Sequence, residues 1–232
     1  MPRSIAFSAV LATAINVSTA LFASAATITY TNQAAFAAAT SGISFTTVDF
    51  EGIAADNSFV FEPTPPGVTL MGANFTIDHT TGNTGVLFVI GDGFYYSGNS
   101  VLSSQQSTPV ANNIVIAFPG LQTALSLNLG TLEGAESWSW ALPNGDTGVL
   151  SAPAFDTLSF FGLTSTSGFN TLRLTGPANP AVGDAMNIDN VSFGAGGVAT
   201  VPEPASMVLV GSALALAGGR RRRALRGQHE ST

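Results

Sequence analysis

The feature that most constrains the fold is a long series of short apolar segments, separated by Gly, Pro, Asn and Asp, that begins near residue 43. Each segment has the length and the turn-forming borders of a β-strand. No long helical stretch lies between them, so the pattern predicts an all-β domain, an antiparallel β-sandwich of jelly-roll type. The clearest predicted strands are Ile43–Phe50, Val68–Ile77, Val86–Ile90, Asn113–Phe118, Ala124–Leu129, Ser137–Leu142, Thr157–Leu163, Phe169–Thr175 and Asn187–Phe193.

One short helix and one tight turn complete this prediction. Asn32 can cap an N-terminal helix over residues 33–39, and Gly42 follows as its stop signal. Residues 143–146, Pro-Asn-Gly-Asp, have the composition of a hairpin turn.

The first 26 residues have the pattern of a secretory signal peptide. Arg3 gives a positive start, and an apolar run follows from Ile5 to Phe22. Ala25 and Ala26 then supply the small residues that a signal peptidase requires, so we expect cleavage after one of them. A retained N-terminal anchor is the alternative.

The segment over residues 201–226 combines an extended motif, a short apolar stretch and a basic tail. Residues 201–204 are Val-Pro-Glu-Pro, and the two prolines favour an extended conformation. Residues 205–219 predict a transmembrane helix of only about 22 Å, short of a hydrocarbon core of about 30 Å. A helix this short suits temporary rather than permanent anchoring of the protein in the membrane. The basic tail, residues 220–226, would keep its end in the cytoplasm through Arg220, Arg221, Arg222 and Arg223.

This order of motif, helix and basic cluster resembles the PEP-CTERM sorting signal of Gram-negative bacteria. The resemblance implies that a membrane-embedded exosortase recognises Pro202, Glu203 and Pro204, removes the tail and releases the protein. It therefore implies export across the inner membrane, with signal peptidase and exosortase as partners. Transient anchoring would be followed by a place on the cell surface or in the extracellular matrix. An ordinary tail anchor after a proline-rich linker is the alternative.

The composition between the two ends limits the partners of the outer domain, which we place at residues 27–194 with a linker over residues 195–200. From Thr27 to Thr200 the chain has no Lys and no Cys, and one Arg against twelve acidic residues. So acidic a domain repels phosphate backbones, which excludes nucleic-acid binding. It suits cations, or neutral partners such as polysaccharide. The absence of Cys excludes disulfides and thiolate metal sites.

The outer domain carries a second resemblance at its first and last strands. Residues 48–52, Val-Asp-Phe-Glu-Gly, and residues 187–193, Asn-Ile-Asp-Asn-Val-Ser-Phe, resemble the corresponding strands of jelly-roll carbohydrate-binding modules. In those modules such acidic residues often help to hold a structural calcium ion.

Asp189 is the most informative polar residue of the domain. If Val191 and Phe193 face the core, strand alternation turns Asp189 inward with them. An inward carboxylate needs a hydrogen bond, a cation or a proton. Arg173 alternates with two leucines, which turns it outward and away from this role.

Three alternatives remain for Asp189. Backbone N–H groups can cap the carboxylate, or it can bind a structural Ca²⁺ together with Asp49 and Glu51 from the first strand, because Ca²⁺ takes carboxylate oxygens readily. A catalytic role is the third.

Two aromatic pairs are candidates for ligand binding. Trp138 and Trp140 lie two residues apart, so their indoles share one face of a strand and could form a stacking platform for sugar rings. The alternative is that both belong to the core. Tyr95 and Tyr96 lie in a Gly-bordered loop and could add to a binding surface.

An enzyme has little support in this sequence, and we predict a non-catalytic protein. A Ser–His–Asp relay would have to use His79 beside Asp78, and no nucleophile elbow is present. Glu133 and Glu136 could be imagined as a glycosidase pair, although such loop acids are usually solvated charges.

The sequence therefore predicts an exported, exosortase-processed surface or matrix-associated protein whose outer domain is a polysaccharide-binding or adhesive module. The alternatives are a purely structural envelope protein, an ice-binding protein and a glycoside hydrolase. Ice binding is suggested only because proteins with similar C-terminal segments are sometimes described as ice-binding. The threonines of this sequence are scattered and do not form the regularly spaced rows of solenoid ice-binding proteins.

Overall fold

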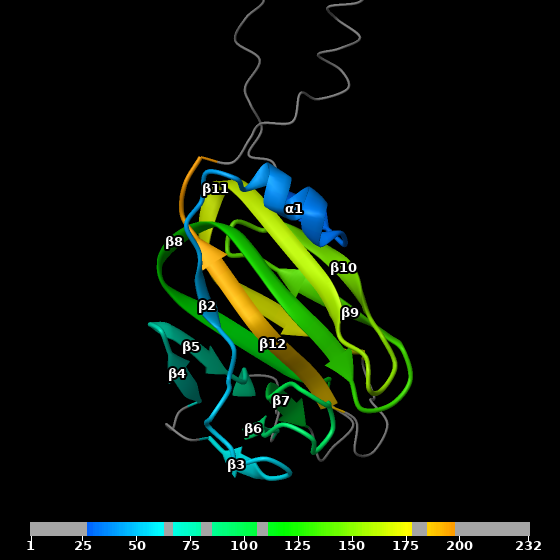
Figure 1. Ribbon diagram of the computed structural model, residues 1–232. Helices are drawn as coiled ribbons and strands as arrows, with labels where there is room; N and C mark the ends of the chain where they lie inside the picture. The colour runs from blue at the N-terminus through cyan, green and yellow to red at the C-terminus, as the bar shows by residue number, and fades with distance from the viewer. Residues whose placement is uncertain (1–26, 63–66, 80–84, 106–110, 178–184, 198–232) are drawn as a thin grey trace, which may run out of the picture. The chain divides into compact units, whose positions relative to one another are not determined.

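The computed structural model describes residues 27–62, 67–79, 85–105, 111–177 and 185–197 (Figure 1). All of them belong to the first of two units of the chain, Met1–Val198. The elements are β1 Thr27–Tyr30, α1 Gln33–Ala39, β2 Thr46–Val48, β3 Phe59–Phe61, β4 Val68–Leu70, β5 Ala73–Thr76, β6 Val86–Ile90, β7 Val101–Gln105, β8 Asn113–Thr131, β9 Glu136–Ala141, β10 Thr147–Ala152, β11 Ser159–Thr175 and β12 Ala185–Gly194.

Two long strands, β8 and β11, organise the domain. They pair antiparallel along most of their length, but the register shifts between Thr164 and Thr171 of β11. On β8 the interruption faces Pro119 and Gly120, where a proline cannot donate to the ladder. Each strand therefore has two halves, and each half pairs with different neighbours.

The two halves build two layers of one continuous antiparallel sheet. The C-terminal half of β8 pairs with β12, and the neighbours β7, β6 and β3 follow in that order. β1 pairs with the N-terminal half of β11, and β2 pairs with β12. The N-terminal half of β8 pairs with β5, which in turn pairs with β4. The C-terminal half of β11 pairs with β9, which in turn pairs with β10.

The main hydrophobic core joins residues of both layers. Leu125, Leu127 and Leu129 alternate along β8 in the first layer, and all three are buried. Leu172 and Leu174 of β11 belong to the same cluster from the second layer. Strand alternation thus places one face of each layer in the core, as the sequence pattern predicts.

The opposite face of the first layer carries two smaller clusters. At one end α1 lies across the sheet (Figure 1), where Phe36 packs with Ile43 and Ala124. In the other cluster, the loop between β6 and β7 brings Tyr96 onto Phe88, Ile90 and Val101.

The predicted helix is confirmed residue for residue, and its Asn32 Oδ1 accepts a hydrogen bond from Ala35 N at 3.0 Å. Its C-cap is Thr40 rather than Gly42. The predicted turn at residues 143–146 is also confirmed, because it joins β9 to β10 with Gly145 at φ +92°.

Several predicted strand boundaries are wrong. The segment 68–77 is a hairpin, not one strand, because Met71 and Gly72 turn with positive φ. Conversely, the segments 113–118 and 124–129 are one bent strand, as are 157–163 and 169–175. Four strands escaped prediction: β1, β3, β7 and β10.

The signal peptide, residues 1–26, and the sorting segment, residues 201–226, lie outside the described residues. Among the described residues the one α-helix, α1, has seven residues and is too short to span a membrane.

Candidate functional site

The two tryptophans belong to the core. Trp138 is fully buried and Trp140 is 5% exposed, and both lie in the main hydrophobic cluster. Trp138 Nε1 donates to Glu136 Oε2 at 3.2 Å, and the ring of Trp140 packs near Phe161. A sugar-stacking platform needs exposed ring faces, so the prediction of ligand binding at Trp138 and Trp140 is wrong and the core alternative holds.

Asp189 is buried, but not on the face that alternation predicts. The register between β12 and β8 shifts after Asp189, and Asn190 adopts a positive φ of +50°. This bulge inserts one residue, so Ile188 before it and Val191 after it both enter the main core. Asp189 instead pairs with Asn128, on the opposite face of the first layer.

The carboxylate of Asp189 is held by its neighbour. Asn190 donates its backbone N–H to Oδ1 at 2.6 Å and its side-chain amide to Oδ2 at 2.7 Å. Burial raises the pKa of Asp189 to about 7; the backbone hydrogen bond opposes the rise, and the charges of Glu51 and Asp49 add to it. Glu51 and Asp49 are therefore near enough to Asp189 to contribute to its pKa.

In this structure the three acids accept hydrogen bonds from groups of the protein itself. Both oxygens of Glu51 accept from Ser100, from its N–H at 2.8 Å and its hydroxyl at 2.9 Å. Asp49 Oδ1 faces the backbone N–H of Glu51 at 3.3 Å. The carboxylates are thus turned toward N–H and O–H donors, and no three acidic or imidazole side chains among the described residues are grouped to hold a metal. Structural Ca²⁺ remains a prediction without support from this geometry.

The candidate catalytic residues are engaged elsewhere or exposed. Asp78 forms an ion pair with Arg173. Glu136 accepts from Trp138, as described above, while Glu133 is exposed in the loop after β8.

The exposed aromatic side chains gather on the β3 edge and two loops. Phe59 and Phe61 lie on β3, Phe94 and Tyr95 lie in the loop between β6 and β7, and Phe155 follows β10. Each ring contacts the next one along the surface. The distances between ring centroids are 5.1 Å for Phe61–Phe59, 5.8 Å for Phe59–Phe94, 4.6 Å for Phe94–Tyr95 and 6.3 Å for Tyr95–Phe155. We call these five residues the aromatic strip.

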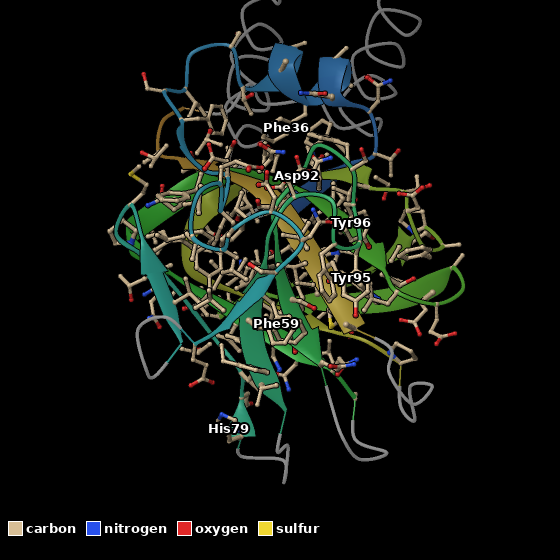
Figure 2. The ribbon with its side chains drawn as sticks, turned by 60° about the horizontal axis from the view of Figure 1, so that its bottom comes forward. Phe36, Phe59, His79, Asp92, Tyr95 and Tyr96 are labelled. Carbon is tan, nitrogen blue, oxygen red and sulfur yellow. The ribbon has the colours of Figure 1, made fainter. Side chains whose placement is uncertain are left out.

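The aromatic strip is open to solvent. The exposed fractions are 45% for Phe59, 58% for Phe61, 38% for Phe94 and 48% for Phe155. Figure 2, which turns the lower end of Figure 1 forward, shows Phe59 and Tyr95 on this side of the molecule. Contiguous exposed apolar surface of this kind marks interaction sites.

Successive rings of the strip stand nearly perpendicular to one another, with interplanar angles of 80° to 90° for the four contacts. Edge-to-face packing is the preferred geometry of aromatic pairs and fixes their orientation. The rings therefore present alternating faces and edges, and they do not form one flat surface.

Pairing with β6 positions the β3 end of the strip. Phe61 pairs with Phe88 across the two strands, and Phe59 contacts the same ring at 6.1 Å between centroids. Because residues two apart share a face, Phe59 and Phe61 emerge on one side while Val60 packs toward the core.

Tyr96 anchors the loop that carries Phe94 and Tyr95. Its hydroxyl donates to Thr131 O at 2.9 Å and accepts from Asn187 Nδ2 at 3.2 Å, both in buried positions. Gly130 makes room for this contact, because a Cβ there would lie 2.9 Å from the hydroxyl and 2.6 Å from Thr157 O. Within the loop, Gly93 N donates to Tyr96 O at 3.0 Å, with Gly93 at φ +77°.

Sequence reasoning pointed to Tyr95 and Tyr96 but missed the phenylalanines of the strip. The structure divides the tyrosines: Tyr96 is buried as an anchor, and Tyr95 is half-exposed within the strip. The alternation of Phe59 and Phe61 around Val60 was the available signal, but three residues are too few to predict a strand with periodicity.

Comparison with known proteins identifies the sorting segment. Residues 200–223 match the model of the PEP-CTERM protein-sorting motif, which confirms the resemblance of the C-terminal segment. A search of curated proteins gives no match.

The solved structures that resemble the domain include carbohydrate-binding modules. One is a family 29 carbohydrate-binding module complexed with mannohexaose, with a TM-score of 0.39 and 12% identity, covering 66% of this chain and 93% of that one. Another is the family 11 module from Clostridium thermocellum, in complex with a β-1,3-1,4-mixed-linked tetrasaccharide, with a TM-score of 0.36 and 9% identity, covering 67% and 98%. The similarity is distant.

Proposed function

We propose that this protein is a non-catalytic surface or matrix module that binds extracellular polysaccharide through the aromatic strip. The signal peptide at residues 1–26 exports it across the inner membrane of a Gram-negative cell. The segment at residues 201–226 then holds it there until an exosortase processes it at Pro202, Glu203 and Pro204. The outer domain, a sandwich of jelly-roll type in this proposal, reaches the cell surface or the matrix.

The observation that carries this proposal is the run of four exposed phenylalanines joined through Tyr95. Exposing rings to water costs free energy, roughly 25 cal/mol for each Å² of apolar surface left unburied. A partner that covers the strip recovers that free energy. Sugar rings suit such a surface because their C–H faces pack on aromatic faces while their hydroxyls stay hydrated.

The ring geometry also limits the form of the polysaccharide. A crystalline polysaccharide presents a plane and needs coplanar rings, which the strip does not offer. Perpendicular neighbours suit one flexible glycan chain that turns from ring to ring. The strip itself therefore lacks a flat, regular face of the kind that ice binding uses.

The experiment is a titration of the exported, processed protein with soluble glycan chains by calorimetry. Phe59→Ala and Phe94→Ala remove partly exposed rings, so we expect weaker binding, with a circular dichroism spectrum that shows the fold retained. Leu121→Ala is the matched control, because Leu121 is 62% exposed but lies on β8 outside the strip. No binding to any glycan, with the protein still retained at the surface, would instead support a purely structural envelope protein.

A further inference from the structure

We propose that the aromatic strip selects glycans that carry free amino groups, such as polymers of unacetylated amino sugars. This inference rests on the proposed function and names its ligand class. It follows from the acidic residues that lie on the same elements as the rings.

Several acidic residues lie on the same elements as the rings of the strip. Glu62 follows Phe61 at the end of β3, and Asp156 follows Phe155. Glu133 lies beside Phe155 as well, since Phe155 N donates to the carbonyl of Glu133 at 3.0 Å. Glu133 and Asp156 are both exposed.

The loop that carries Phe94 and Tyr95 holds a further acid. Asp92 Oδ1 accepts the backbone N–H of Gly98 at 2.6 Å, which fixes the carboxylate across the base of the loop. Asn57 N donates to Asp92 O at 2.8 Å and ties the loop to the segment before β3. Figure 2 shows Asp92 on the same side of the molecule as Tyr95 and Phe59.

No positive side chain on these elements offsets the acids. The described ranges of the chain contain no Lys and a single Arg, Arg173, which forms an ion pair with Asp78 in the second layer. The strip therefore combines π faces, which attract cations, with carboxylates that attract the same cations.

Charge complementarity selects among polysaccharides. Uronic-acid polymers are repelled by the acids, and neutral glucans gain only ring packing. An amino-sugar polymer presents an apolar ring face and an ammonium group in every unit. A continuous run of rings, with acids on the same elements, suits a polymer of one repeated unit better than a peptide of mixed side chains.

The test compares two oligosaccharides of equal length, glucosamine oligomers and their fully N-acetylated counterparts, with the processed protein at mildly acidic pH. We expect the amino form to bind about tenfold more tightly. The preference should disappear in about 1 M NaCl, because salt screens exposed charges. A Lys-containing peptide of equal charge serves as the competing class of ligand.

Two variants separate charge from ring packing. The double variant Glu133→Gln with Asp156→Asn should show a smaller preference, since Glu62 and Asp92 remain, and should still bind the acetylated oligomer. Phe59→Ala should weaken the binding of both oligomers. Asp146→Asn, at the far end of the β9–β10 hairpin, is the matched charge control and should change neither.

Each outcome decides a different claim. Equal affinity for the two oligomers overturns the amino-sugar inference and leaves the proposed function standing. Failure to bind any oligomer overturns the proposed function itself. Tighter binding of the Lys-containing peptide overturns the assignment of a glycan.

Discussion

Replacing Asp189 with Asn should stabilise the protein at neutral and alkaline pH, although Asp189 is buried and hydrogen-bonded. The pKa of this carboxyl rises from 3.8 to about 7 on folding, chiefly because of burial. Between these values the folded protein keeps a proton that the unfolded chain has lost. The free energy of unfolding therefore falls as pH rises from about 4 to about 7.

The magnitude follows from the pKa shift. Each pKa unit corresponds to 1.36 kcal/mol, so the loss approaches about 4 kcal/mol above the folded pKa and is absent below about pH 4. An asparagine at this position does not ionise, so Asp189→Asn should remove this pH dependence. The gain at about pH 8 should therefore approach the same value, about 4 kcal/mol, because the pKa of about 7 already includes the backbone hydrogen bond from Asn190 to the ionised carboxylate.

Chemical denaturation of both proteins between about pH 4 and about pH 8 measures the effect. We expect similar stability at the acidic end and a more stable variant at the alkaline end. Asp49→Asn is the matched control, since it removes a minor contributor to the shift and should reduce the slope only slightly. Parallel pH profiles for parent and Asp189→Asn would refute the reasoning.

The same proteins test the calcium prediction. If the carboxylates are held by Asn190 and Ser100 alone, a chelator should leave the melting temperature of the parent unchanged. A chelator-dependent drop that Asp189→Asn abolishes would instead show that Asp189 binds a metal ion.

The remaining predictions concern the core, the loop anchor and the tail. Trp138→Ala should cost about 3–5 kcal/mol of stability through a core cavity; a fully stable variant with weakened glycan binding would contradict the burial. Gly130→Ala should destabilise the protein and loosen the loop of Phe94, because the new Cβ meets Thr157 O and the Tyr96 hydroxyl; hydrogen exchange of residues 91–100 would report this, and unchanged protection would count against it. Glu203→Ala should leave the tail attached, so mass spectrometry of the cell-surface protein should find residues beyond 204; normal release would argue against exosortase processing.

The sequence predicts those features that repeat over several residues. Leu125, Leu127 and Leu129 show enough alternation to assign one face of β8 to the core. Asn32 predicts the start of the helix because an asparagine side chain can cap the first backbone N–H groups. The same alternation placed Trp138 and Trp140 together, but it could not tell a core face from an exposed one. That distinction depends on the second layer, which packs against it only after the sheet folds over.

Other features depend on single residues that break a pattern. The bulge at Asn190 changes which side of the sheet Asp189 occupies, and the residues around it give no sequence signal that predicts a bulge. Phe59 and Phe155 lie far apart in the chain and meet only through β3, the loop after β6 and the segment after β10. A site assembled from such short pieces becomes visible only in the folded structure.

The most direct test of the central claim is the affinity of the processed protein for the exopolysaccharide of its own cells, measured beside a Phe59→Ala and Phe94→Ala double variant. If the aromatic strip is the binding surface, the parent should bind and the double variant should lose at least about tenfold in affinity, while its circular dichroism spectrum shows the fold retained. Equal affinity of the two proteins would show that the strip is not the binding surface.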